Sequence, residues 1–258
     1  MKKYKDIAIQ AAKEAAGVHK RYFLSNFQVK RKNKSYDLVT VVDVESEKAV
    51  VSLIRKNFPG HNILAEEGKY KKTDSEYRWI IDPLDGTNNF FSGLPIFCVS
   101  IALAKHDEVI LGVIYDPTRD ELFCTEKGRG AYLNGKRIKV SPATKLTDSI
   151  LITGFYYDRG KEMIDALDKI KQFFFKKVLG LRRFGSAALD FCNVACGRAA
   201  GFWEFELNAW DFAAGKLIVE EAGGRVTGRY GERVPLKKTF VVASNGKIHK
   251  KMLEVLKK

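Results

Sequence analysis

The sequence is poor in cysteine and contains no long apolar run. Its longest apolar stretches, such as IFCVSIALA and VILGVIY, have the length of strands, whereas a membrane-spanning helix needs roughly 18 consecutive apolar residues. The few cysteines are too scattered to form a disulfide framework; they are Cys98, Cys124, Cys192 and Cys196. The last two stand one helical turn apart, and without a second cysteine or histidine pair nearby we expect them to pack in the core.

The N-terminus lacks the apolar centre of a signal peptide. The segment MKKYKDIAIQAAKEAAG begins with lysines, but Asp6, Gln10, Lys13 and Glu14 interrupt its apolar residues. We therefore expect a cytoplasmic protein that does not associate with membranes.

Acidic residues are outnumbered by basic ones. The chain has 45 Lys and Arg against 31 Asp and Glu, which gives a formal net charge of +14. Such a charge is compatible with nucleic-acid binding, or with a positive field that attracts an anionic substrate. The lysines are spread over segments such as KRKNK, KYKK and KIHKK, without interleaved aromatic residues that would stack on bases. This spread favours a lysine-rich solvated surface over either kind of partner.

Motifs for nucleophilic catalysis are also missing. The four histidines lie near no serine or cysteine motif, and the chain has no GxxxxGK[ST] phosphate-binding loop. The histidines are His19, His61, His106 and His249. Carboxylates therefore remain as the main candidates for chemistry.

The first half of the chain predicts two helices followed by an antiparallel sheet. Apolar residues recur at helical spacing between residues 7 and 22, and a second helix is expected over residues 44–57 with Asp43 as its N-cap. Strands are expected at NILAE and YRWIID. The β-rich runs FCVSIALA, EVILGVIYD, ELFCTE, GAYL and KRIKV then predict a meander, in which Asn134 and Gly135 form a two-residue hairpin turn.

The second half alternates strands and helices. Strands are expected at SILITGFY, KKVLGLR, GFWEFE and FVVASN, with helices over about residues 160–173, 186–197 and 210–222 and at the C-terminus. Alternation of this kind predicts a mixed sheet covered by helices. We therefore expect a layered α+β fold in a single domain over residues 1–258. Its lobes would cover about residues 1–145 (antiparallel sheet) and 146–258 (α/β), with a cleft between them.

The stretch WIIDPLDGTNNF predicts a metal site. Asp82 stands near the end of an apolar strand, and Pro83 keeps Asp82 out of the helical region. The chain should turn there, so that Asp82 and Asp85 point to one place and Leu84 offers its carbonyl oxygen. Such hard oxygen donors select Mg²⁺, Mn²⁺ or Ca²⁺. The following DGTNNF can open a short helix, whose N–H groups and Thr87 hydroxyl suit a phosphate.

Two further segments carry acids where strands or helices should meet this site. NILAEEG ends with Glu66 and Glu67, and LNAWDFAAG places Asp211 at a helix start. Taken singly, these acids are typical of a solvated turn and a helix cap. Together with DPLD, they favour a cluster that needs a cation or raised pKa values. A glycosidase needs only a pair of acids, whereas a phosphatase places divalent ions between several acids and its anionic substrate.

These residues resemble the inositol monophosphatase family of magnesium-dependent, lithium-sensitive sugar phosphatases. The match extends over essentially the whole chain, through DLVTVVDVESE, ILAEEG, WIIDPLDGTNNF, GSAALD and WDFAAGKLIVEEAGG. The D-P-x-D-G-T box together with W-D-x-A-x-G is highly specific, and RRFGSAALDFCNVACGR followed by NAWDFAAG is most similar to bacterial and archaeal members. The resemblance implies an α/β/α/β/α layered sandwich, usually dimeric, with two or three Mg²⁺ ions.

The resemblance also implies roles for individual residues. Glu66, Asp82 and the Leu84 carbonyl would hold the first metal, while Asp82, Asp85 and Asp211 would hold the second, with a third, weaker ion near Glu66. Catalysis would fall to Asp43, Glu66 and Thr87, because Asp43 would pair with Thr87 to activate the attacking water. This role replaces the interpretation of Asp43 as a plain N-cap. Substrate contacts would come from Leu84, Asp85, Gly86, Thr87, Arg182, Ser186, Ala187, Glu204 and Asp211.

The implied reaction is in-line hydrolysis of inositol 1-phosphate or a similar sugar or polyol phosphate, without a phosphoenzyme. Arg182 or its neighbour Arg183 could instead make a structural ion pair or bind a second phosphate. That option leaves open a fructose 1,6-bisphosphatase or an enzyme with both activities. NAWD departs from the His-Cys-Trp-Asp of animal members, so their substrate preference does not carry over. A partner of RNA polymerase or of ribosome assembly is the alternative from another class.

Overall fold

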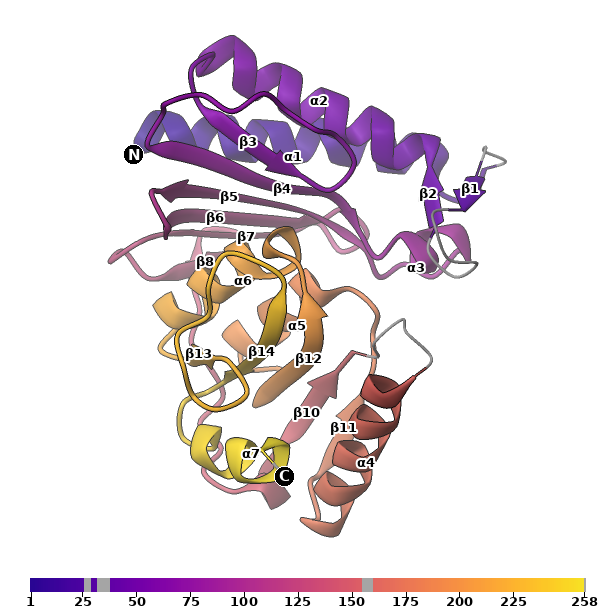
Figure 1. The fold of residues 1–258 in the computed structure, drawn as a ribbon, viewed down its shortest axis with the longest axis vertical. Helices are drawn as coiled ribbons and strands as arrows, with labels where there is room; N and C mark the ends of the chain where they lie inside the picture. Colours follow the sequence, from indigo (N-terminus) through magenta and orange to yellow (C-terminus); the bar gives the residue numbers. More distant parts are fainter. Residues whose placement is uncertain (26–28, 32–37, 155–159, 258) are drawn as a thin grey trace.

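The computed structural model describes residues 1–25, 29–31, 38–154 and 160–257, with side chains undescribed at 29–31 and 38–39. The chain is arranged in five layers, in the order helices, sheet, helices, sheet, helices (Figure 1). This is the layered α+β sandwich that the sequence and the resemblance predicted. Across the described residues, no helix combines the length and the apolar character needed to cross a bilayer.

The first two layers are a helix pair and a seven-stranded sheet. Helices α1 (Lys2–Tyr22) and α2 (Val41–Asn57) cover one face of the sheet (Figure 1). The strand order is β3-β4-β5-β6-β7-β8-β9, antiparallel except that β3 runs parallel to β4. The strands are β3 (Asn62–Ala65), β4 (Tyr77–Asp85), β5 (Cys98–Lys105), β6 (Glu108–Asp116), β7 (Glu121–Glu126), β8 (Ala131–Leu133) and β9 (Lys136–Arg137).

The meander from β5 to β9 confirms the sequence prediction. Asn134 and Gly135 both adopt positive φ angles, 48° and 76°, as a two-residue hairpin turn of the primed kind requires. The sheet as a whole is mixed, because the edge strand β3 reaches β4 through residues 66–76 instead of through a tight hairpin. Two short strands, β1 (Val29–Arg31) and β2 (Leu38–Thr40), pair with each other and were not anticipated.

The remaining layers hold a five-stranded sheet between two helix pairs. Helices α5 (Ala187–Ala195) and α6 (Ala209–Glu221) form the central layer, and α4 (Lys161–Phe175) and α7 (His249–Leu256) the outer one (Figure 1). The strand order is β11-β10-β12-β14-β13. These strands are β10 (Ile150–Thr153), β11 (Gly180–Arg182), β12 (Gly201–Leu207), β13 (Arg225–Thr227) and β14 (Thr239–Ser244). The expected strand over 149–156 ends at Thr153, and residues 155 and 156 lie outside the described residues. Strand β13 was not anticipated.

Both faces of the large sheet are buried. Trp79 and Ile81 pack with α1 and α2, whereas Ile80 between them packs with α5 and α6, as the alternation of side chains along a strand requires. Cys192 is fully buried in the central cluster and Cys196 packs against it, so these two cysteines are core residues as expected.

Two sequence expectations near the acidic motifs were wrong. Strand β4 does not end at Asp82 but continues to Asp85, with an irregular register between the two residues. Pro83 is tolerated there because it removes a donor where the ladder is already interrupted. Helix α2 begins at Val41 rather than Val44, and its N-cap is Thr40, with Asp43 at the third helical position of a capping box.

Candidate active site

Four carboxylates converge between the large sheet and the central helices. Asp82 and Asp85 lie at the end of β4, Glu66 directly follows β3, and Asp211 is in the first turn of α6. Burial raises the pKa of Asp82 well above its usual range, and the charges of Glu66, Asp85 and Asp211 raise it further. Such mutual repulsion requires the four groups to be neighbours, so the acids singled out in three separate motifs are brought together.

The acids of this cluster are held by local hydrogen bonds. Asp82 Oδ1 accepts the Leu84 N–H at 3.1 Å, and Asp211 Oδ2 accepts the Asn208 N–H at 2.6 Å. Within the described part of the chain, no three acidic, histidine or cysteine side chains are arranged closely enough to enclose a metal ion. The donor set nevertheless fits a hard divalent cation, because the four side chains are carboxylates whose charges repel one another, and carboxylate oxygens are the ligands that such a cation prefers.

Asp85 is held by the N-terminus of α5. Its Oδ2 accepts the Ser186 hydroxyl and the Ala188 N–H, both at 2.7 Å, and the Cys98 thiol at 3.8 Å. Burial raises the pKa of Asp85, while these hydrogen bonds and one from the Ala187 N–H act in the opposite direction. Ser186 and Ala187, which the resemblance put on the substrate side, therefore both contact Asp85.

Asp43 joins α2 to the turn after β4. Thr87 Oγ1 lies 3.0 Å from Asp43 Oδ1 and 3.1 Å from the Leu84 carbonyl oxygen, so its single proton can be donated to either. The other carboxylate oxygen of Asp43 accepts the N–H and the hydroxyl of Thr40, each at 2.6 Å. Asp43 is only 1% exposed. Asp43 is thus the N3 partner of the Thr40 cap, not the N-cap expected from the sequence, and it makes the Thr87 contact expected from the resemblance.

Gly86 allows the chain to turn into the short helix α3 (Thr87–Phe91). Its φ angle is +99°, and a Cβ atom there would lie 2.8 Å from the Ile96 carbonyl oxygen. Both the left-handed backbone and the close approach require glycine. Asn89 in α3 donates to the carbonyl oxygens of Ile96 and Phe184, both at 2.8 Å, which ties this turn to the segment before α5.

A second group of charges lies beside Asp85. Burial raises the pKa of Glu204 in β12 to about 8, and the charge of Asp85 adds to this, while Arg183 acts in the opposite direction. The Glu204 carboxylate occupies the space where a side chain at Gly154 would lie. Asp190 is 1% exposed with Oδ1 unpartnered, and burial together with the charges of Glu204 and Asp85 raises its pKa.

Of the two adjacent arginines, Arg183 is the one whose charge acts on Glu204 and Asp190. Arg182 lines a separate cavity of about 370 Å³ together with Arg119 and Arg198, and none of the carboxylates above lines that cavity. The charge of Arg183, in contrast, lowers the pKa of both Glu204 and Asp190. Adjacent residues leave a strand end in different directions, so the sequence pair Arg182-Arg183 could not show which one faces the acids.

His19 is a residue near the site that sequence reasoning missed. It is fully buried in α1, and its Nε2 lies 2.9 Å from the carbonyl oxygen of Pro83. Because a carbonyl can only accept, Nε2 carries a proton; burial lowers the pKa of His19 to about 4, so the ring is neutral near pH 7. His19 lies 64 positions from Pro83, so no local pattern could reveal this contact.

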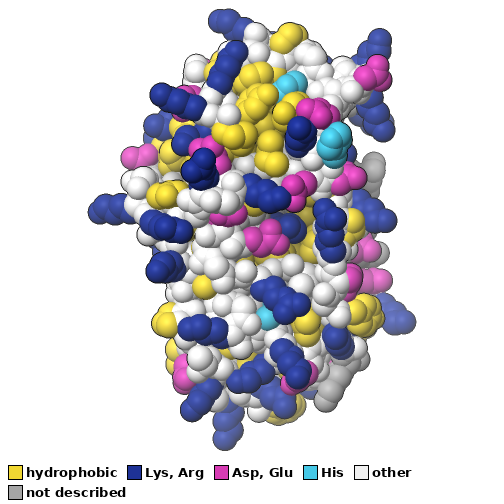
Figure 2. Space-filling model, turned by 90° about the vertical axis from the view of Figure 1, so that its left-hand side faces the viewer, with side chains coloured by type: hydrophobic (Ala, Val, Ile, Leu, Met, Phe, Trp, Pro, Cys, Tyr) yellow, Lys and Arg dark blue, Asp and Glu magenta, His cyan; other side chains and the backbone are white. Residues whose placement is uncertain are grey.

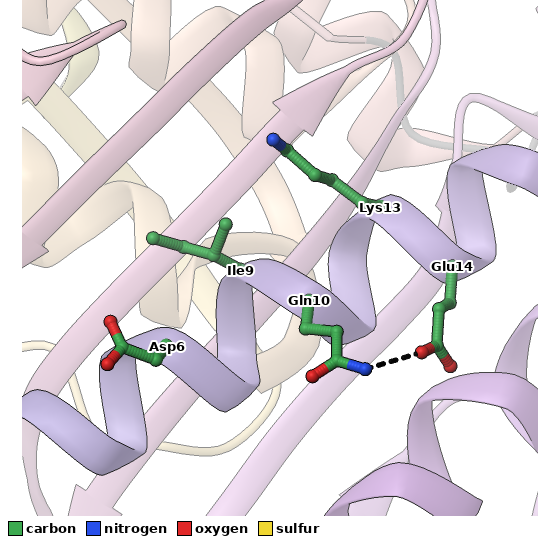
Figure 3. A pocket seen from close by; sticks show the side chains of 5 residues that line it. All are labelled: Asp6, Ile9, Gln10, Lys13 and Glu14. Carbon is green, nitrogen blue, oxygen red and sulfur yellow. Dashed lines mark hydrogen bonds between the residues drawn. The ribbon is translucent and has the colours of Figure 1, made fainter.

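Two of the surface hollows in the N-terminal half lie along β3 and on α1. One of about 700 Å³ runs along β3 and the following segment, and its lining includes Glu66, Glu67 and Trp210. The other, of about 460 Å³, lies on the outer face of α1, where Gln10 donates to Glu14 (Figure 3). All its lining residues come from that one helix, and none belongs to the acidic cluster.

Comparison with known proteins shows which family the sequence resembles. The chain matches the inositol monophosphatase family over residues 1–258. It is 40% identical to an inositol-1-monophosphatase from Mesorhizobium japonicum, over 98% of this chain and 96% of the relative. It is 42% identical to the Nus factor SuhB from Escherichia coli K12, over 96% and 93% of the two chains.

A solved structure with the same fold carries a metal and an anion. An IMPase/NADP phosphatase in complex with Mg²⁺ and phosphate superposes with a TM-score of 0.83 at 26% identity, covering 94% of this chain and 90% of that one. The specific motifs, the layered fold and the full-length match agree with one another. The chain belongs to the inositol monophosphatase family.

Proposed function

We propose that the protein hydrolyses the phosphate monoester of inositol or of a similar polyol with the help of Mg²⁺. The observation that carries this proposal is the meeting of Glu66, Asp82, Asp85 and Asp211 in one cluster next to the Asp43–Thr87 pair. A phosphate dianion would be repelled by these acids alone. The cluster is therefore useful to a phosphatase only when cations separate the acids from the phosphate.

Glu66, Asp82, Asp85, Asp211 and the Leu84 carbonyl oxygen are the groups that would hold Mg²⁺ in this proposal. Bound Mg²⁺ would polarise the phosphate and make a water molecule more acidic. The ions would also remove the mutual repulsion that raises the pKa values of the cluster. We propose two ions, with a third, weaker one near Glu66, and competition by Li⁺.

Thr87 and Asp43 would position and deprotonate the attacking water. When Thr87 Oγ1 donates its proton to Asp43 Oδ1, its lone pairs are free to accept a hydrogen bond from water. The second oxygen of Asp43 is fixed by Thr40, so the pair is rigid before substrate binds. The backbone N–H groups of Gly86 and Thr87 would bind the phosphate oxygens.

The alcohol half of the substrate would lie between Glu204, Arg183 and the start of α5. A carboxylate accepts hydrogen bonds from the hydroxyl groups of a polyol, and an arginine can hold a second anionic group. Arg183 is thus the residue that would separate a monophosphatase from a fructose 1,6-bisphosphatase. A panel of inositol 1-phosphate, glycerol 2-phosphate and fructose 1,6-bisphosphate, with and without Li⁺, ranks these substrates.

The test of the metal cluster is the release of phosphate by Asp82→Asn and Asp85→Asn variants. Each substitution removes one negative charge and keeps the side-chain volume. We expect Mg²⁺-dependent activity to fall at least about 100-fold while the circular dichroism spectrum is retained. Activity that survives both changes would refute the assignment.

A second candidate function is that of a transcription or ribosome-assembly partner. The relatives named Nus factor SuhB and the net charge of +14 favour it. Lys and Arg side chains are, however, distributed over the face in Figure 2 instead of forming one basic stripe. Salt-dependent RNA binding that persists in the Asp85→Asn variant would support this function, and an absence of binding at low salt would eliminate it.

We also propose a homodimer in the cytoplasm. Helix α4 exposes four large apolar side chains, namely Ile164 (65%), Leu167 (47%), Phe174 (54%) and Phe175 (76%), more than a solvated helix normally shows. All four cysteines are free, as a reducing compartment favours. Light scattering coupled to size-exclusion chromatography measures the mass, and a monomer at micromolar concentration would refute the dimer.

A further inference from the structure

Glu47 is a buried acid on α2 that has no part in the proposed chemistry. It is 4% exposed, and both its carboxylate oxygens are occupied. Oε1 accepts the Tyr70 hydroxyl at 2.6 Å, and Oε2 accepts the backbone N–H of Glu67 at 2.9 Å. A buried carboxylate without a specific role is costly to keep, so its partners indicate what it does.

Its partners belong to the segment that directly follows Glu66. The Glu67 N–H is part of the peptide plane that begins at the Glu66 carbonyl, and this plane is rigid. A hydrogen bond to that N–H therefore restricts the backbone torsion of Glu66 itself. Glu66 follows the edge strand β3, which pairs with β4 and with no other strand of the described residues, so α2 supplies the support that a second neighbouring strand would otherwise give.

The segment is shaped to close on Glu47. A Cβ atom at Gly68 would lie 2.5 Å from Glu47 Oε1 and 2.6 Å from the Tyr70 hydroxyl oxygen, so a side chain there would push these two groups from their present positions. The Arg55 guanidinium, also on α2, lies 4.9 Å from the centre of the Tyr70 ring, a distance at which a cation and an aromatic ring attract each other. Three residues of this segment thus dock on one helix.

The same helix carries Asp43. Asp43 and Glu47 are one turn apart and both buried on the inner face of α2, and positions four apart lie on one side of a helix. Asp43 binds Thr87 in the turn after β4, while Glu47 binds the segment after β3. The first two turns of α2 therefore fix the spacing between the ends of these two strands, which carry Glu66, Asp82 and Asp85.

We propose that Glu47 is a positioning residue that locks residues 67–70 onto α2 and thereby sets the Mg²⁺ affinity on the Glu66 side of the cluster. Glu47 itself would touch neither the metal nor the substrate. The inference rests on the proposed function, and it predicts a change in metal binding without a comparable change in the rate at saturating metal.

The experiment compares Mg²⁺ binding to the purified metal-free protein and its variants by titration calorimetry. Glu47→Ala removes both hydrogen bonds, and we expect the Mg²⁺ dissociation constant to rise at least about tenfold, as for other residues that orient metal ligands. The turnover rate at saturating Mg²⁺ should change less than about threefold. Tyr70→Phe removes one of the two bonds and should give a smaller increase. Glu47→Gln keeps an acceptor for the Glu67 N–H and should restore most of the affinity.

A second measurement reports on the segment without metal or activity. Hydrogen exchange of the Glu67 amide should be faster in Glu47→Ala and close to wild type in Glu47→Gln. Glu45→Ala is the matched control, because Glu45 is an acid on α2 that contacts Tyr22 and Arg21 of α1 instead. It should change neither the exchange nor the affinity. If Glu47→Ala does not fold, the Tyr70→Phe and Glu47→Gln variants can still be compared with the wild type in Mg²⁺ affinity and in the exchange of the Glu67 amide.

The outcomes separate this inference from the proposed function. If the wild type binds Mg²⁺ and Glu47→Ala binds it equally well, the positioning role is refuted and the phosphatase proposal is untouched. If Glu47→Ala lowers turnover as strongly at saturating Mg²⁺ as at low Mg²⁺, Glu47 acts on catalysis and the inference is also refuted. A wild type that binds Mg²⁺ but releases no phosphate contradicts the proposed function alone. No Mg²⁺ binding at all overturns both.

Discussion

Glu204 makes the stability of the metal-free protein depend on pH. Its pKa is raised to about 8 in the folded state, chiefly by burial, whereas an unfolded glutamate titrates near pH 4.3. The folded protein therefore binds the proton more tightly, and stability falls as pH rises from about 4.3 to about 8. The free energy of unfolding changes by at most about 1.4 kcal/mol per pH unit through this group, and the change is smaller where solvent screens the charge.

Replacing Glu204 by Gln should remove this contribution. We expect the Glu204→Gln variant to lose less stability than the wild type between pH 5 and pH 8 in the absence of metal, measured by urea unfolding at each pH. Glu232→Gln, at an acid of the loop after β13, is the control. Parallel pH curves for wild type and Glu204→Gln would show that Glu204 is ionised at a normal pH.

His19 changes the stability of the protein with pH in the opposite direction to Glu204. Its pKa is lowered to about 4 by burial, so the unfolded state, with a pKa near 6.5, binds the proton more tightly. The stability that neutral His19 contributes is present above pH 6.5 and is lost as pH falls towards 4. This corresponds to about 3 kcal/mol over the whole interval.

Two substitutions separate the titration of His19 from its hydrogen bond. Glutamine can donate from a position close to Nε2, so His19→Gln should keep the Pro83 contact and flatten the unfolding curve between pH 6.5 and 4. His19→Phe leaves the Pro83 carbonyl without its donor and should lower stability by about 1–3 kcal/mol at pH 7. Equal acid sensitivity in His19→Gln and wild type would contradict the assignment.

At the scale of elements, the turn between β4 and α3 depends on Gly86. An alanine there would have to adopt a left-handed φ angle, at a cost of about 1–2 kcal/mol, and its Cβ would press on the Ile96 carbonyl. We expect Gly86→Ala to lower the melting temperature and to reduce phosphate release at least about 100-fold, because α3 and Thr87 are displaced.

Gly128→Ala provides the matched comparison for this turn. Gly128 also has a positive φ angle, 75°, but a Cβ there meets open space. The Gly128→Ala variant should therefore have a lower melting temperature, caused by backbone strain alone, and its rate of phosphate release should be unchanged. Similar activity in the two variants would show that the close approach at Gly86 does not position the site.

At the scale of the whole molecule, Mg²⁺ should stabilise the protein more at high pH than at low pH. Burial raises the pKa values of Asp82, Asp85 and Asp211, so these carboxyl groups hold protons at low pH more readily than ordinary carboxyl groups do, and the protons must leave before metal binds. We expect the rise in melting temperature on adding Mg²⁺ to be larger at pH 8 than at pH 5, by differential scanning fluorimetry. NaCl at equal ionic strength is the control. An equal rise at both pH values would contradict cation binding by this cluster.

We further propose that both sheets unfold in one transition. The central cluster joins Ile80 and Ile114 of the large sheet, through α5 and α6, to Phe202 and Val241 of the small one. Separating the sheets would expose this whole apolar surface to water. Two resolved calorimetric transitions would instead indicate lobes that unfold independently.

Much of the fold could be predicted from the sequence, because many of its helices, strands and turns are specified by local sequence patterns. The helical stripe of α1, the Asn134-Gly135 turn and the alternation after residue 150 each depend on neighbouring residues alone. The boundaries of α2 and β4 were wrong because Thr40 competes with Asp43 for the cap, and because Pro83 sits in an interrupted strand instead of ending one. Strand β13 is only three residues long and pairs with a strand that follows it, so it leaves no clear local pattern.

The sequence by itself determined the family and singled out the candidate acids, since the D-P-x-D-G-T and W-D-x-A-x-G boxes place these residues close together in the chain. Only the tertiary structure decided which side chains support those acids. His19 reaches Pro83, Ser186 reaches Asp85 and Glu47 reaches Glu67 across 64, 101 and 20 positions. Contacts of this kind depend on how the helix and sheet layers pack against one another. That packing results from many weak contacts between residues far apart in the chain, so no short stretch of sequence reveals it.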